Sequence, residues 1–156
     1  MRVKTRGFSL AEIIVVIAII GILAMIAVPN MLTTRISTNE SAATSLLGSI
    51  FSAAQSYRLS AGNLLPDSVA DLQNATPPYG NFCTNVSDCR NSGYIFQISG
   101  TGIDADFFAS AVPEAYGTAG KRKFCVTTDG VIRSLDDGNA TPPTDVSACN
   151  TWTSLQ

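Results

Sequence analysis

The sequence predicts an α+β protein in which a long N-terminal α-helix packs on a small antiparallel β-sheet. Three observations lead to this fold class. An almost uncharged apolar run occupies residues 8–28, and apolar residues then recur every three or four positions as far as Tyr57. After Gly62 the composition changes to short strand-like runs separated by Gly, Pro, Asn, Asp and Thr, and all four cysteines lie in this part of the chain.

The overall composition limits the classes of function. The chain has 156 residues, of which 14% are charged, with 10 basic residues, 12 acidic residues and no histidine. Charged residues make up about 25% of a typical domain, so part of this chain is expected to lie outside water. The slight acidity argues against nucleic-acid binding, which needs a clustered basic surface. The lack of histidine removes imidazole catalysis and the commonest zinc sites. We therefore expect a membrane-linked or structural protein with no enzyme activity, cofactor or metal.

The apolar run over residues 8–28 is long enough to cross a bilayer, at about 1.5 Å per helical residue. Arg2, Lys4 and Arg6 precede it, and such a basic flank stays on the cytoplasmic side. A secretory signal peptide and a plain transmembrane anchor are two interpretations of this pattern. Glu12 counts against both, because a carboxylate at the centre of a bilayer costs about 2.5–3.5 kcal/mol and usually has a partner.

The run Arg6-Gly7-Phe8-Ser9-Leu10-Ala11-Glu12, followed by the apolar stretch and Pro29, resembles the N-terminus of a type IV prepilin. In that family a prepilin peptidase cuts after the glycine and methylates the new N-terminal phenylalanine. The resemblance therefore implies cleavage between Gly7 and Phe8 and N-methylation of Phe8. It also implies that Glu12 pairs with the Phe8 amine of an adjacent subunit during assembly. The Ser-Leu-Ala at 9–11 is a mild departure from the Thr-Leu-Ile or Thr-Leu-Val that is common in the family.

The resemblance implies a structural subunit that polymerises into a type IV pilus and serves adhesion, twitching motility or DNA uptake. Its partners would be other pilin subunits, the prepilin peptidase, the inner-membrane assembly platform and, before assembly, the bilayer, with no specific nucleic acid. The precursor would lie in the bacterial inner membrane and the mature protein in an extracellular filament. Two alternatives stay open: a pseudopilin of a type II secretion system, and a membrane-anchored exported domain with a binding or enzymatic function.

The helix is expected to run from about residue 8 to residue 59 and to stop at Gly62-Asn63. Pro29 lacks an amide donor and Gly21 is a weak helix former, so both are expected kink sites. Beyond the apolar run the helix is expected to be amphipathic. Its apolar stripe is Leu32, Ile36, Ala43, Leu46, Leu47, Ile50, Phe51, Ala54 and Tyr57. Its polar positions are Arg35, Ser37, Thr38, Asn39, Glu40, Ser41, Ser45 and Gln55.

The segment after Gly62 is expected to hold a short helix and a sheet. The helix covers residues 68–73, and the strand-like runs cover residues 93–99, 105–111, 122–127 and 131–135. Asp129-Gly130 predicts a tight hairpin between the last two strands, because both positions tolerate positive φ. The sheet face that covers the apolar stripe of the helix is expected to carry Tyr94, Phe96, Ile98, Phe124 and Val126.

The four cysteines are Cys83, Cys89, Cys125 and Cys149, and their spacing does not resemble a CxxC redox or zinc site. An even number in an exported domain with a small core indicates disulfides. Three pairings are possible. We favour Cys83–Cys89, which closes a short loop, and Cys125–Cys149, which ties the C-terminal tail to the sheet, with free buried cysteines as the alternative. The second bridge also resembles the disulfide-bounded C-terminal loop of many type IV pilins.

Two weaker patterns lie in the C-terminal part. Asp129, Asp136, Asp137 and Asn139 carry oxygens that could hold calcium, as in the C-terminal loop of related secretion pseudopilins, but the EF-hand spacing is absent. The basic run at residues 121–123 is interpreted as a solvated strand end rather than as an adhesive or DNA-binding surface.

These interpretations divide the chain into four segments. Residues 1–7 are the leader peptide, and residues 8–28 are the hydrophobic transmembrane and assembly helix. Residues 29–61 are the amphipathic helix that continues into the head. Residues 62–156 are the extracytoplasmic globular domain with its disulfide-bonded C-terminal loop.

Overall fold

The computed structural model describes residues 7–85, 87–99 and 107–155, and of residues 26–30 it describes the backbone alone. Of the expected leader, residues 1–6 lie outside the described residues. The chain divides into two compact units after Thr34. Helix α1 spans Leu10–Ser60 and contributes to both units. The expected bounds of this helix therefore hold to within two residues at each end.

Helix α1 ends where the sequence predicts. Gly62 and Asn63 both have positive φ, 67° and 73°, which is a conformation that glycine and asparagine adopt more readily than other residues. The Asn63 N–H donates to the Arg58 carbonyl at 2.9 Å, and the Ala61 N–H donates to the Tyr57 carbonyl at 2.8 Å. Two carbonyls of the last turn, which would otherwise have no partner, are thereby satisfied.

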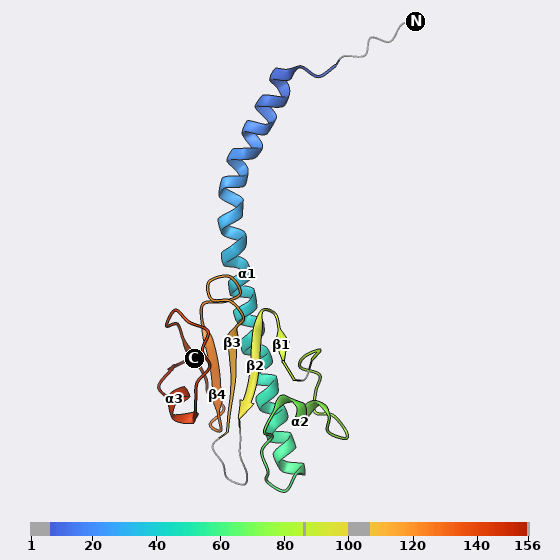
Figure 1. Ribbon diagram of the computed structural model, residues 1–156, viewed down its shortest axis with the longest axis vertical. Helices are drawn as coiled ribbons and strands as arrows, with labels where there is room; N and C mark the ends of the chain where they lie inside the picture. The colour runs from blue at the N-terminus through green and yellow to red at the C-terminus, as the bar shows by residue number, and fades with distance from the viewer. Residues whose placement is uncertain (1–6, 86, 100–106, 156) are drawn as a thin grey trace, which may run out of the picture. The chain divides into compact units, whose positions relative to one another are not determined.

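The second unit contains a six-stranded antiparallel sheet in the order β1-β2-β3-β4-β5-β6. Strands β1 to β4 are labelled in Figure 1. The long helix together with this small sheet confirms the α+β class. The strands are β1 Arg90–Asn91, β2 Tyr94–Ser99, β3 Phe108–Pro113, β4 Lys123–Thr127, β5 Ile132–Leu135 and β6 Thr153–Ser154, and the short helices are α2 Val69–Gln73 and α3 Val146–Asn150.

The four longer strands and α2 correspond to the predicted elements. The third strand extends to Pro113 rather than to residue 111, and the expected residues 105 and 106 lie outside the described part of the chain. Strands β1 and β6 are edge strands that the sequence does not predict, because two residues are too few to show an alternating pattern.

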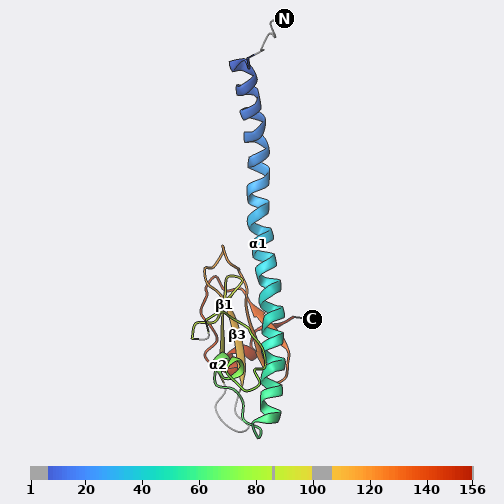
Figure 2. The same cartoon turned by 90° about the vertical axis from the view of Figure 1, so that its right-hand side faces the viewer.

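One face of the sheet packs against α1, as the two views agree (Figures 1 and 2). Phe96, Ala111 and Phe124 form one row across β2, β3 and β4, and all three are buried. Leu47 and Ile50 of the helix are fully buried in the same core. The small alanine between two phenylalanines leaves space for the helix, because side chains in one row of a sheet lie side by side. The apolar stripe and the predicted sheet face therefore form one core.

The other face of the sheet is covered as well. Every residue of β3 and β4 is buried, although a sheet with one solvated face would show alternation. On this side Cys125, Cys149 and Trp152 form a second buried cluster, with Leu135 packed against it. The C-terminal segment thus serves as the outer layer of the domain.

The hairpin between β4 and β5 is wider than the tight turn that Asp129-Gly130 predicts. Only Gly130 of the two has a positive φ, 76°, and its N–H donates to the Thr127 carbonyl at 3.0 Å. The Asp129 carboxylate accepts hydrogen bonds from Thr127 Oγ1 at 2.8 Å and from the Val131 N–H at 3.0 Å. Because the side chain of Asp129 holds the turn together, its backbone has no need of the left-handed conformation.

Candidate functional site

The described chain begins with a short, exposed, non-helical stretch. Gly7 and Phe8 are exposed, and Phe8 retains 85% of its accessible surface. The first helical turn is closed by a reciprocal pair of hydrogen bonds. The Ser9 N–H donates to Glu12 Oε2 at 2.8 Å, and the Glu12 N–H donates to Ser9 Oγ at 3.2 Å. With Ser9 as its cap residue, the helix begins at Leu10. The bond between Gly7 and Phe8 therefore lies in non-helical backbone.

Phe8 and Glu12, the two residues expected to act in assembly, lie next to each other. They line one surface hollow together with Ala11, Val15 and Val16. A carboxylate in the first turn of a helix is stabilised by the positive end of the helix dipole. Glu12 is therefore held by its own chain, and its pairing with the amine of a neighbouring subunit stays a prediction.

The first part of α1 carries apolar side chains all around its axis. The large hydrophobic residues between Leu10 and Met25 retain 49% to 81% of their accessible surface. A helix that is apolar on every side is typical of a segment surrounded by other apolar groups.

Among the residues that the structure describes, no helix is both long enough and apolar enough to cross a membrane.

Helix α1 continues through Gly21 and Pro29 without a break. The kinks expected at these two residues stay predictions.

The C-terminal segment is fastened to the outer face of β4 at three alternate positions. Lys123 bonds to the loop after β5, Cys125 forms a disulfide with Cys149, and Thr127 Oγ1 lies 3.4 Å from Asn150 Oδ1. The second disulfide joins Cys83 to Cys89, so both bridges are those favoured from the sequence. Residues two apart in a strand point to the same side, which is why one short strand can hold three parts of the tail.

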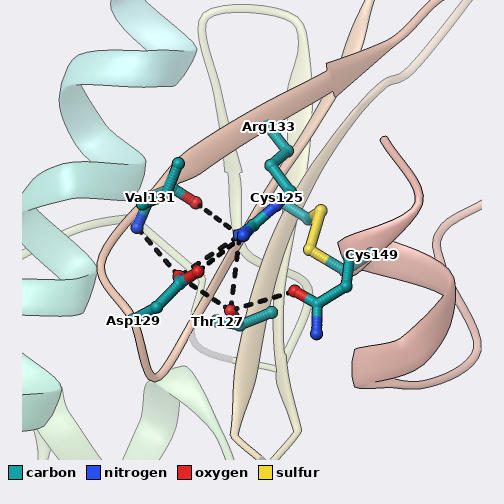
Figure 3. A network of polar contacts seen from close by, with 7 residues as sticks. Cys125, Thr127, Asp129, Val131, Arg133 and Cys149 are labelled. Carbon is teal, nitrogen blue, oxygen red and sulfur yellow. Dashed lines mark hydrogen bonds and ion pairs between the residues drawn. A yellow bond between two sulfur atoms is a disulfide. The ribbon is translucent and has the colours of Figure 1, made fainter. Parts of the chain in front are cut away.

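A polar network lies beside the Cys125–Cys149 bridge (Figure 3). Arg133 Nη2 lies 2.5 Å from Asp129 Oδ2, and Arg133 Nη1 donates to Asp129 Oδ1 at 3.2 Å and to the Val131 carbonyl at 3.1 Å. This two-point contact between guanidinium and carboxylate fixes both side chains. Arg133 is also the residue opposite Cys125 in the β4–β5 pairing, so the network supports the strand that carries the disulfide.

The Asp129–Arg133 pair predicts a loss of stability in acid. The hydrogen bonds from Arg133, with smaller contributions from Val131 and Thr127, hold the pKa of Asp129 well below its usual value of 3.8. Native Asp129 thus binds a proton less readily than the unfolded chain does, so its stabilising effect is complete above about pH 4 and is lost as the pH falls below that. Urea unfolding at a series of pH values should show a steeper acid loss in the wild type than in Asp129→Asn. Arg133→Gln should flatten the profile as well, and unchanged profiles in both variants would contradict this assignment.

The carboxylates considered for calcium have partners within the chain. Asp129 bonds to Arg133, Asp136 accepts from the Tyr116 hydroxyl at 2.7 Å, and Asp137 bonds to Lys123 at 2.8 Å. Among the described residues, no group of three or more His, Cys, Asp or Glu side chains is arranged to hold a metal ion.

Glu40 is buried, although the sequence places it among the polar positions of the helix. It retains 6% of its accessible surface. Glu40 Oε1 accepts from the N–H groups of Lys121 and Arg122 at 3.0 and 3.1 Å, and Glu40 Oε2 lies 2.8 Å from both Nε and Nη2 of Arg122. Next to it, Asn39 Nδ2 donates to the Ala119 carbonyl at 2.8 Å. Asn39 and Glu40 therefore fasten α1 to the connection between β3 and β4.

The interpretation of residues 121–123 as a solvated strand end is wrong for Lys123, which is buried. Arg122 is about half exposed and is bound to Glu40. The physical reason is that the burial of Lys123 is compensated by the Asp137 carboxylate, 14 positions further along the chain, which a local charge count does not reveal.

Two capping residues that were not expected from the sequence, Ser9 and Asp145, do have a local signal in it. The S-x-x-E spacing of Ser9 and Glu12 is the signature of a capping box. Asp145 caps the N-terminus of α3, because its Oδ1 accepts from the Ala148 N–H at 2.7 Å, and Asp is a preferred N-cap residue. Glu40 carries no such signal, since its partners lie about 80 residues away.

Comparison with known proteins identifies one family model and several relatives. The model described as "Prokaryotic N-terminal methylation motif" matches residues 2–28. The chain is 41% identical over 54 residues to the type IV major pilin protein PilA of Myxococcus xanthus. It is 41% identical over 56 residues to the type II secretion system core protein G of Escherichia coli. It is 36% identical over 56 residues to the type IV wide pilus major component PilA4 of Thermus thermophilus.

These similarities cover only part of each chain. The matched segment is 35% or 36% of this chain, and it is 24% of PilA, 39% of the E. coli core protein G and 43% of PilA4. The chain thus aligns with less than half of the length of these relatives. No solved structure matches it.

Proposed function

We propose that the chain is a type IV pilin-like protein that polymerises into a type IV pilus, because its N-terminal part matches the methylation-motif model and is similar to type IV pilins. In this proposal the chain acts as a structural subunit, as its similarity to a type IV major pilin and to a type II secretion core protein suggests, and it has no enzymatic role. As precursor it would lie in the inner membrane, and after processing it would form part of an extracellular filament. The observation that carries the proposal is the N-terminal arrangement. An exposed Gly7-Phe8 bond precedes a capped helix whose first turn holds Glu12 and whose following turns are apolar.

The first step in this proposal is removal of the leader between Gly7 and Phe8 by a prepilin peptidase, with methylation of the new amine. The non-helical backbone at Gly7 and Phe8 supports it, because a peptidase would not have to unwind a helix to reach this bond. Cleavage creates a positive charge at the Phe8 amine, and Phe8 and Glu12 line the same surface hollow. Methylation keeps that charge.

The second step is assembly through the apolar part of α1. Lipid is already apolar, so association of such helices depends on close packing and on polar pairing rather than on the hydrophobic effect. A carboxylate buried without a partner is costly. Packing in the register that places Glu12 beside the Phe8 amine of the adjacent subunit would remove this cost. The apolar side chains between Leu10 and Met25, which have little cover within one chain, would then pack against those of neighbouring subunits.

Substitution of Glu12 tests this proposal. We expect Glu12→Ala to abolish surface filaments while the processed protein still accumulates in the membrane. Glu12→Gln is the matched control, because glutamine can keep the capping-box hydrogen bond with Ser9 but has no charge. It should also lose filaments if charge pairing is the reason. The measurement is negative-stain microscopy of sheared surface material, with sequencing of the N-terminal residue of the shed protein.

Two results would overturn the proposal. One is a shed protein that begins at a residue other than Phe8. The other is a Glu12→Ala variant that makes filaments at the wild-type level.

A second candidate function is that of a pseudopilin in a type II secretion system. The similarity to core protein G of Escherichia coli and of Pectobacterium carotovorum favours it. The C-terminal loop closed by Cys125–Cys149 favours the pilus, because it resembles the disulfide-bounded loop of many type IV pilins. Disruption of the gene separates the two functions. Loss of surface filaments supports the pilus, whereas loss of protein export with filaments intact supports the pseudopilin.

A further inference from the structure

The ammonium group of Lys123 lies inside a cage of three oxygen atoms. Lys123 Nζ is 2.8 Å from Asp137 Oδ2, 3.1 Å from Asn139 Oδ1 and 3.1 Å from the Thr141 carbonyl oxygen. The side chain is only 5% exposed. An ammonium group has three N–H donors, and each of them finds one acceptor here. The group is therefore fully coordinated by the chain itself.

The three oxygens come from alternate residues of one short stretch, Asp137-Gly138-Asn139-Ala140-Thr141. A carboxylate, a side-chain amide and a backbone carbonyl are the oxygen types that bind Ca²⁺, and Asp and Asn two residues apart occur in calcium-binding loops. Gly138 has a positive φ of 78°, which turns the backbone between the two side chains.

The stretch is also held in place without the lysine. Asn139 Oδ1 accepts from the Thr141 N–H at 2.9 Å and from Thr141 Oγ1 at 2.8 Å. The Trp152 ring also lies with its centroid 5.3 Å from Lys123 Nζ, within the range of a cation–π interaction. The surroundings of the ammonium group are therefore those of a site for a cation.

We propose that residues 137–141 form a cation-binding loop whose cation is the ammonium group of Lys123, supplied by strand β4. The loop then folds without a metal ion. Removal of the ammonium would leave a negatively charged oxygen site that Ca²⁺ can enter. In the wild type the hydrogen bond from Lys123 also holds the pKa of Asp137 below its usual value.

Luminescence of Tb³⁺, which replaces Ca²⁺ in oxygen sites, tests the proposal on the purified full-length protein in detergent. Trp152 is the single tryptophan of the chain and can sensitise a Tb³⁺ ion bound in the cage. We expect no sensitised emission from the wild type, strong emission from Lys123→Ala, and competition by Ca²⁺. Mg²⁺ should compete poorly, because it demands a stricter octahedral geometry. Lys123→Ala combined with Asp137→Asn is the matched control, and its emission should return to the wild-type level.

Thermal unfolding gives a second measurement. The Tm of the wild type should be the same in Ca²⁺ and in EGTA. The Tm of Lys123→Ala should be lower in EGTA and should rise by several degrees in millimolar Ca²⁺, because a ligand that binds only the folded state stabilises it.

Three outcomes would overturn the proposal. They are a Lys123→Ala variant that responds to neither ion, a wild type that binds Tb³⁺ equally well, and failure of both Lys123→Ala and Lys123→Ser to fold in Ca²⁺ as well as in EGTA.

Discussion

Replacement of Cys125 and Cys149 by alanine is expected to lower the free energy of unfolding by about 3 kcal/mol, because the bridge closes a long loop and restricts the unfolded chain. Both cysteines are fully buried between the sheet and the C-terminal segment. The measurement is chemical unfolding of the full-length protein in detergent, under oxidising conditions, with the wild type and the double variant side by side.

The other disulfide supplies the matched control. Cys83 and Cys89 are also buried but are separated by only six positions, against 24 for Cys125 and Cys149. The loop-entropy model therefore predicts a smaller loss, about 2 kcal/mol, for Cys83→Ala with Cys89→Ala. An equal or larger loss from the short bridge would show that the long bridge does not act through the entropy of the tail.

Glu40→Ala is expected to destabilise the protein by about 3 kcal/mol. The change removes the acceptor of two backbone N–H groups, those of Lys121 and Arg122, and leaves the Arg122 guanidinium without its carboxylate. A buried donor without a partner costs about 1–3 kcal/mol. The partial exposure of Arg122 moderates the electrostatic part, because water can solvate the guanidinium. The change in unfolding free energy is measurable by denaturant titration.

Two variants separate charge from hydrogen bonding at this position. Glu40→Gln keeps an oxygen that can accept from the two N–H groups, so we expect it to lose only about 1 kcal/mol. Glu114→Ala removes an exposed carboxylate 3.7 Å from Arg90 and should change stability by less than about 0.5 kcal/mol. If all three variants had the same stability, Glu40 would not fasten the helix to the β3–β4 connection.

The features that the sequence determines by itself are those written within short stretches of chain. The long helix, its end at Gly62-Asn63 and helix α2 follow from periodicity, turn residues and caps, because hydrogen bonds between near neighbours produce them. The four longer strands follow from their strand-like composition and from the turn residues between them. The N-terminal run that resembles a prepilin is equally local, and the family model matches this part of the chain. This pattern can be read from the sequence because its residues lie within a few positions of one another along the chain.

Tertiary structure alone decides which charges are buried. Glu40 and Lys123 look like surface residues in the sequence, yet each is buried and each bonds to a segment that is distant along the chain. Tertiary structure also produces the edge strands β1 and β6, because each of them forms only by pairing with a longer strand beside it. The physical reason is that burial of a charge depends on whether partners from elsewhere compensate the lost hydration. Those partners come together only when the helix, the sheet and the C-terminal segment pack.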